Sequence, residues 1–167
     1  MPLPGAFERI DTRLTSWMAD NAVLLTRIGL GIVFVWFGVL KFFPHMSPAE
    51  DLASRTIEKL SFGFIGRKPA LYILAPWEVA IGLGLLTGKF LRATLFLLFV
   101  QMAGTLTPLV LFPSETFQFF PYAPTLEGQY IIKNLALVAG ALVIGATVRG
   151  GYLRSMPPSV RSQRVPW

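Results

Sequence analysis

Four long apolar segments dominate the pattern of hydrophobic and polar positions along the chain. They cover about residues 22–43, 70–88, 91–112 and 129–148. A membrane-spanning helix needs about 20 mostly apolar residues, so each segment is long enough to cross a bilayer. None of them shows the period-two alternation that is typical of transmembrane strands. The pattern therefore predicts an all-α fold, an integral membrane four-helix bundle.

Shorter amphipathic segments lie on either side of the first span. Ahead of it, five apolar residues fall on one helical face and predict an N-terminal interfacial helix: Phe7, Ile10, Leu14, Trp17 and Met18. After it, Ser47, Pro48 and Glu50 are typical of a capped helix start, and apolar residues then repeat at helical spacing. We expect this short amphipathic helix of the first outer loop to lie flat on the outer surface and to end near Gly63. The second outer loop, 113–125, is rich in proline and aromatic residues and predicts an interfacial cap.

Composition supports a membrane protein and limits its chemistry. The 167 residues are 53% hydrophobic and only 14% charged, with a mean hydropathy of +0.58, whereas soluble domains are about 25% charged. The sequence has no cysteine and one histidine, which excludes a thiolate metal site, a disulfide framework and a histidine-rich metal site. We therefore expect no metal site, and any electron carrier has to come from outside the chain.

Charge predicts the orientation. Lysines and arginines are more numerous on the side that holds both termini: Arg9, Arg13, Lys89, Arg92, Arg149, Arg154, Arg161 and Arg164. The opposite side holds Arg55, Lys59, Arg67 and Lys68. The positive-inside rule then places both termini in the cytoplasm. We expect one transmembrane domain over 1–151 and a basic, proline-containing tail over 152–167, which contacts anionic lipid rather than nucleic acid.

Polar residues inside the spans are the candidate functional residues. Ionisable groups at bilayer depth are costly, usually face the bundle interior and often mark function. Glu78 is the candidate acid, and Lys133 or Lys41 is the candidate base. Further candidates for ligand binding are Arg27, Trp36, Lys41, Trp77, Gln101, Thr105, Gln129, Tyr130 and Asn134. Arg27 falls near the inner interface, whereas the strongest polar groups of all four spans fall in the outer half.

Two interpretations of this polar layer stay open. One is a pocket that opens outward, with Glu78 and Lys133 exchanging protons. An apolar, aromatic-lined cleft with a few polar groups suits a quinone, and Trp77 and Tyr130 could line it. The other is a buried ion pair and hydrogen-bond network that fixes the register of the helices. The sequence contains no phosphate loop, dinucleotide fingerprint or nucleophile elbow.

Three stretches resemble the DoxX family of small four-span membrane proteins: RIGLGIVFVWFGVLKF (27–42), WEVAIGLGLLTGKFLR (77–92) and KNLALVAGALV (133–143). GTLTPLVLF (104–112) and EGQYIIKN (127–134) are similar to the membrane proteins linked to reactive-chlorine resistance. The resemblance implies a bacterial inner-membrane protein. Relatives include the membrane subunit of a thiosulfate:quinone oxidoreductase and a member of a membrane complex against oxidative stress.

The resemblance thus implies a quinone-linked redox or oxidative-stress component, with quinone as cofactor and a redox protein as partner. Because the sequence lacks cysteine, a thiol-based mechanism does not carry over. A small-solute carrier and a non-catalytic scaffold for partner proteins are the alternatives. A bundle of four short helices has a limited interior, which favours homo-oligomerisation without setting a stoichiometry.

Overall fold

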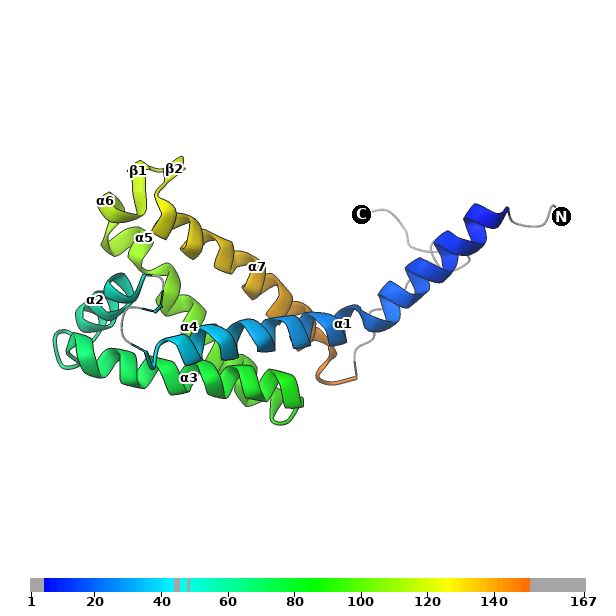
Figure 1. Ribbon diagram of the computed structural model, residues 1–167, viewed down its shortest axis with the longest axis horizontal. Coiled ribbons are helices and arrows are strands. Elements are labelled where there is room, and N and C mark those ends of the chain that lie inside the picture. Colours follow the sequence, from blue (N-terminus) through cyan, green and yellow to red (C-terminus); the bar gives the residue numbers. More distant parts are fainter. Residues whose placement is uncertain (1–4, 44–45, 48, 151–167) are drawn as a thin grey trace, which may run out of the picture.

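The computed structural model describes residues 5–43, 46–47 and 49–150, and it is a helical bundle (Figure 1). Its helices are α1 (Ala6–Leu40), α2 (Glu50–Leu60), α3 (Arg67–Thr87), α4 (Leu91–Leu106), α5 (Pro108–Leu111), α6 (Pro113–Thr116) and α7 (Leu126–Thr147). Two short antiparallel strands, β1 (Phe117–Phe119) and β2 (Ala123–Pro124), form a hairpin. The predicted tail, 152–167, lies outside the described residues.

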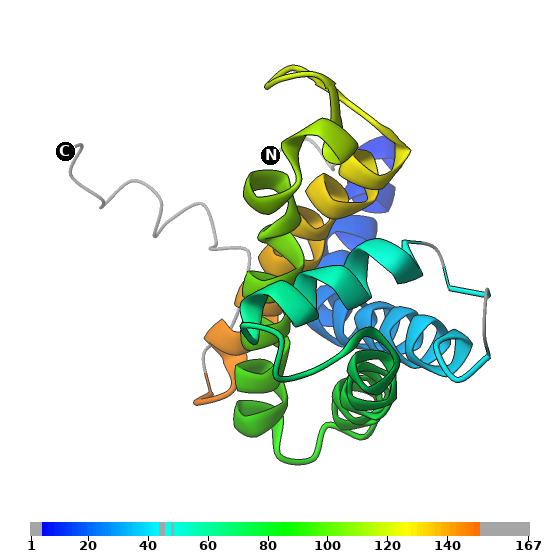
Figure 2. The ribbon, with the colours of Figure 1, turned by 90° about the vertical axis from the view of Figure 1, so that its left-hand side faces the viewer.

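Four helices are long and apolar enough to cross a membrane: Phe7–Leu40, Arg67–Thr87, Leu91–Leu111 and Leu126–Thr147. The prediction of an all-α membrane bundle is therefore confirmed. Each long helix packs against two others, in the cyclic order α1, α3, α4, α7. We call the end of the bundle that carries α2, α6 and the hairpin the α2 end (Figure 2). The α3–α4 turn lies at the opposite end.

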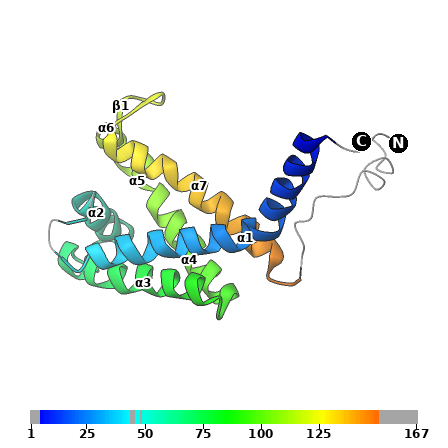
Figure 3. The same ribbon diagram turned by 45° about the vertical axis from the view of Figure 1, so that its right-hand side comes forward.

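Helix α1 joins the predicted interfacial segment to the first span. The two were expected as separate elements, but the structure has one continuous helix because neither glycine nor proline interrupts residues 6–28. The N-terminal part of α1 bends away from the bundle (Figure 3). Its apolar stripe is exposed along the whole segment: Phe7, Ile10, Leu14, Trp17 and Met18.

The most extensive helix contact, between α1 and α3, is made by glycines. A Cβ on Gly82 would lie 2.6 Å from the backbone nitrogen of Val35, and a Cβ on Gly38 would lie 2.9 Å from that of Val79. Side chains at these positions would therefore force the two backbones apart, as in other close-packed membrane helices. Gly38 lies against Glu78, so the next turn of α1 brings Lys41 beside the same carboxylate.

Helix α2 differs from its prediction in two respects. It begins at Glu50 after Ala49, which has a left-handed backbone (φ 55°), so Ser47 is not its N-cap. It ends at Leu60, before the predicted end near Gly63, and it lies across the α2 end of the bundle (Figure 2). Its apolar side packs against α3, with smaller contacts to α4 and α5. An apolar helix face gains more from covering an apolar cavity than from lying at a wet surface.

The second outer loop also folds into defined elements. It forms α6 and the β1–β2 hairpin. Thr116 is fully buried, and its carbonyl accepts a hydrogen bond from the Thr125 amide at 2.9 Å. Gly128 lies against the same carbonyl, where a Cβ would clash. This contact fixes the start of α7 at the α2 end.

Candidate functional site

A cavity of about 420 Å³ lies between the four long helices at the α2 end. Helix α2 covers it with one face, and the other walls come from α1, α3, α4 and α7. Most of the wall is apolar, with aromatic side chains such as Phe34, Phe37 and Trp77. Its size falls within the 300–1,000 Å³ range of small-molecule pockets, and an apolar wall with a few polar groups is typical of them.

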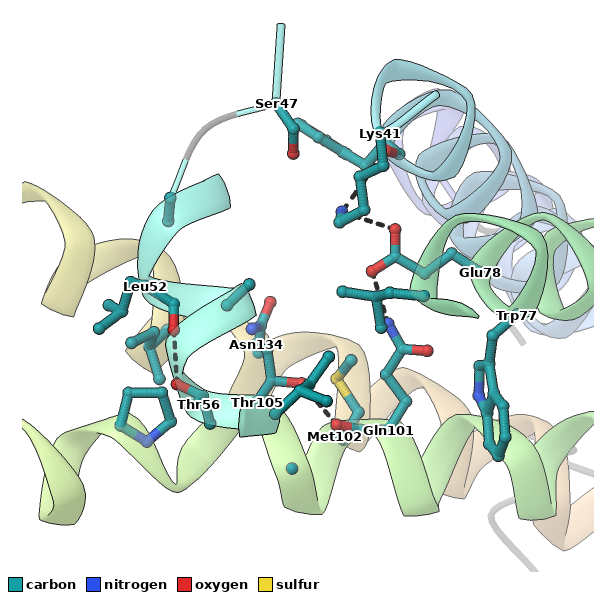
Figure 4. Close-up of a pocket in the computed structure, with 18 of the residues that line it drawn as sticks. Lys41, Ser47, Leu52, Thr56, Trp77, Glu78, Gln101, Met102, Thr105 and Asn134 are labelled. Carbon is teal, nitrogen blue, oxygen red and sulfur yellow. Dashed lines mark hydrogen bonds and ion pairs between the residues drawn. The ribbon is translucent and has the colours of Figure 1, made fainter. Parts of the chain in front are cut away.

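Three side chains from three helices form the polar wall of this cavity (Figure 4). The Lys41 Nζ of the α1 C-cap donates to Glu78 Oε2 of α3 at 2.6 Å. The Gln101 Nε2 of α4 donates to Glu78 Oε1 at 2.5 Å. The Lys41 and Glu78 side chains are only 10% and 11% exposed. Both carboxylate oxygens therefore accept a hydrogen bond in a water-poor setting, where charge-assisted bonds are strong.

Gln101 has one side-chain polar atom that makes no hydrogen bond to a described residue. Its side-chain oxygen is buried and has no hydrogen-bond partner among the described residues. The amide nitrogen is turned toward Glu78, so the oxygen points away from it (Figure 4). A half-turn of the amide would present this acceptor to Glu78 instead. Gln101 can thus serve Glu78 as a donor when the acid is ionised and as an acceptor when it carries a proton.

Lys133 does not join this cluster. It was a candidate base for Glu78, but its side chain is exposed on the outside of α7, and its amine lies 5.5 Å from the centre of the Tyr130 ring. The physical reason is the helix order, because α3 has α1 and α4 as its neighbours and α7 lies across the bundle. The acid–amine pair expected from separate spans is Glu78 with Lys41, the alternative base.

The cavity brings together six of the nine candidate ligand-binding residues: Lys41, Trp77, Gln101, Thr105, Tyr130 and Asn134. The other three lie elsewhere. Trp36 is 65% exposed on the outside of α1, and Gln129 is exposed near the start of α7. Arg27 lies at the opposite end, where its guanidinium packs against Gly88, the left-handed residue that ends α3. Its position suits a cation near the negative end of a helix dipole.

Several lining residues were not predicted from the sequence. The polar ones are Ser47 and Thr56, and Met102 adds a soft, apolar contact. Thr56 donates to the Leu52 carbonyl at 2.6 Å, so its hydroxyl is partly satisfied within α2. The apolar stripe that contains Thr56 was visible in the sequence. The helix was predicted to lie flat on the outer surface, and the sequence did not show what its apolar stripe packs against, which is the cavity.

Charged residues hold α2 in place over the cavity. Arg55 forms a double hydrogen bond with Glu115 of α6 and an ion pair with Asp51 at 2.8 Å. On the other side, Arg67 of α3 pairs with Glu58 at 3.1 Å. The hydrogen bond from Arg55 lowers the pKa of Glu115 below its ordinary value. We call these contacts the α2 clamp.

The fold defines a multi-pass α-helical membrane protein with a covered, largely apolar cavity at one end, which has a polar cluster on its wall. The family model named DoxX matches residues 22–112, and the chain belongs to the DoxX family. This match contains α2 to α5 and the membrane part of α1, and with them Lys41, Glu78 and Gln101. Among curated proteins and solved structures, none matches the chain.

Proposed function

We propose that this protein is the quinone-binding membrane component of a redox system, in which the quinone ring occupies the cavity. The observation that carries this proposal is the Lys41–Glu78–Gln101 cluster on the wall of a largely apolar cavity. A quinone ring is apolar and flat, and its two oxygens need hydrogen-bond donors. The aromatic wall and the polar cluster supply both kinds of contact.

The chain's contribution to the reaction is binding and proton delivery. Reduction of a quinone takes up two electrons and two protons and gives a quinol. Lys41 and Glu78 line the cavity, and we assign them the two protons: the Lys41 ammonium gives one, and the Glu78 carboxylate takes up the second from water and passes it on to the quinone. Gln101 keeps Glu78 hydrogen-bonded in both protonation states. The electrons come from a partner redox protein.

The proposed setting is the bacterial inner membrane, with both termini in the cytoplasm. The α2 end then faces the periplasm, and the cavity lies in the outer leaflet half of the bilayer. Four spanning helices and membership of the DoxX family support a bilayer environment. The excess of Lys and Arg on the terminal side supports the orientation.

Quinone binding by the purified protein tests this function. We expect quinone to co-purify with the protein and to be detected by mass spectrometry of a solvent extract. A short-chain ubiquinone analogue should bind and quench the fluorescence of Trp77, which lines the cavity. Glu78→Gln should weaken its binding by about tenfold or more, because Lys41 and Gln101 then lose the carboxylate that holds them in place.

The matched control is Glu127→Gln, which removes an exposed acid at the start of α7. It should bind the analogue like the unmodified protein. Equal affinity of the Glu78 and Glu127 variants, or absence of binding to the unmodified protein, would overturn the proposed function.

A further inference from the structure

Two exposed residues that line the cavity, Phe37 and Tyr130, lie on α1 and α7. These helices touch at the opposite end, where a Cβ on Gly140 would lie 3.1 Å from Thr26 and 3.2 Å from Leu30. Toward the α2 end they diverge, as two views show (Figure 1; Figure 3). The distance between the two helices therefore grows toward the α2 end.

Side chains at this gap both line the cavity and reach the surface. Phe37 lies two turns beyond Leu30 on α1 and is 40% exposed. Tyr130 on α7 is 45% exposed. Lys133 lies two turns beyond Gly140 toward the α2 end, and its amine lies over the Tyr130 ring on the outer side. The cavity thus reaches the molecular surface between Phe37 and Tyr130.

At the other edge of the cavity, α2 packs against α3. Leu60 and Ile73 are exposed lining residues at that edge, but they lie where α2 packs against α3. The α2 clamp holds this contact. The α1–α7 opening lies between two spanning helices, and Phe37 is only three residues, or about 4.5 Å, from the end of α1. If the end of α1 marks the membrane surface, the opening lies within the hydrocarbon and close to that surface.

We propose that the opening between α1 and α7 is a lateral portal through which a long-chain, lipid-soluble ligand passes from the bilayer into the cavity. The proposal rests on the proposed function and specifies its ligand class. A cavity of about 420 Å³ holds a drug-sized group but not a polyprenyl chain as well. The ring of a long-chain quinone lies at Glu78, and its chain leaves past Phe37 and Tyr130 into the lipid.

Single cysteines can test the portal, because the sequence contains none. Phe37→Cys places one at the portal, Ile73→Cys at the α2–α3 edge, and Tyr72→Cys on an exposed face of α3 that does not line the cavity. Each variant is reacted with a bulky maleimide in detergent. Equilibrium binding of a long-chain ubiquinone and of a short-chain analogue is then measured before and after labelling.

Labelling of Phe37→Cys should weaken binding of the long-chain quinone by about tenfold or more and change binding of the short-chain analogue by less than about threefold. The same label on the Ile73 or Tyr72 variants should change neither affinity. The portal is refuted if the long-chain quinone keeps its affinity after labelling at Phe37, if the label at Ile73 blocks it instead, or if both ligands lose affinity equally.

These outcomes are distinct from failure of the proposed function. A protein that binds neither quinone before labelling has no quinone site at all. A different result is that the protein binds both quinones before labelling and keeps its affinity for the long-chain quinone after labelling at Phe37→Cys. That result would support the quinone site and refute only the portal.

Discussion

The two halves of this bundle are built from the same four helices, but they are packed differently. In the half away from α2, the backbones of α1 and α3 touch and buried aliphatic side chains fill the centre: Leu30, Ile81, Leu85, Leu95, Leu98 and Ile144. In the half near α2, α7 diverges from α1 (Figure 1), and the helices surround a cavity with an acid, an amine and an amide on its wall. The comparison indicates that the half away from α2 stabilises the fold. The half near α2 is less densely packed and forms the candidate binding site.

The largest expected effect on stability comes from breaking the ion pair between Lys41 and Glu78 in the cavity half. Lys41→Met leaves the buried Glu78 carboxylate without its cation, which should cost about 3–5 kcal/mol of unfolding free energy. The double variant Lys41→Met/Glu78→Leu should recover most of this loss, because both charges are then gone. Thermal unfolding in detergent measures both. Equal stability of the single and double variants would contradict the assignment of Lys41 as the partner of Glu78.

The next effect on stability comes from the glycine contact between α1 and α3, which continues into the cavity half at Gly38. Gly38→Leu should force α1 away from α3 and cost about 1–3 kcal/mol, the usual range for overpacking. Gly29→Leu, on the same helix, is the control, because a Cβ there meets no other atom within 4 Å. The melting temperatures of the two variants should differ clearly. A Gly38→Leu protein as stable as the Gly29→Leu protein would show that the backbones are not in contact.

The α2 clamp should give a smaller, pH-dependent effect. Because the pKa of Glu115 is lowered in the folded protein, its pairing with Arg55 stabilises the fold above the ordinary pKa and is lost as pH falls through the lowered value. The melting temperature of Glu115→Gln should therefore be below that of the unmodified protein at pH 7. The difference should be smaller at pH 3, below the ordinary carboxyl pKa of about 4.3. A constant difference at both pH values would argue against this ion pair.

The smallest expected effect is on quinone binding, and it distinguishes the two candidate bases, Lys133 and Lys41. Lys133→Met removes an exposed amine outside the cavity, so equilibrium binding of the short-chain quinone should change by less than about twofold. Lys41→Met/Glu78→Leu, which keeps the fold, should lose that binding. If the Lys133 variant were the one to lose binding, Lys133 would be the base and the cavity half would need a different geometry.

The sequence predicted the four spans because length and hydropathy are local properties of the chain. It also selected Glu78, Lys41 and Gln101, since charged and amide groups are conspicuous among apolar residues. It could not choose between Lys41 and Lys133, because helical periodicity does not state which helices are neighbours. That choice depends on Gly38, whose contact with α3 places Lys41 beside Glu78.

The sequence also could not place α2. Its amphipathic pattern is the same for a helix on a membrane surface and for a helix over an apolar cavity. The deciding contacts are ion pairs between residues far apart in the chain, such as Arg55 with Glu115. Thr56 was missed as a lining residue for the same reason.

The glycine contact between α1 and α3 also limits which helices can move when the cavity widens. Two helices with touching backbones move as one rigid body, since sliding would require their interlocked surfaces to separate. Any widening that admits a bulky guest must therefore come from α7 swinging about its contact at Gly140, or from α2 lifting off. Spectroscopic probes that follow this motion are best placed on those two helices, with the α1–α3 pair as the fixed frame.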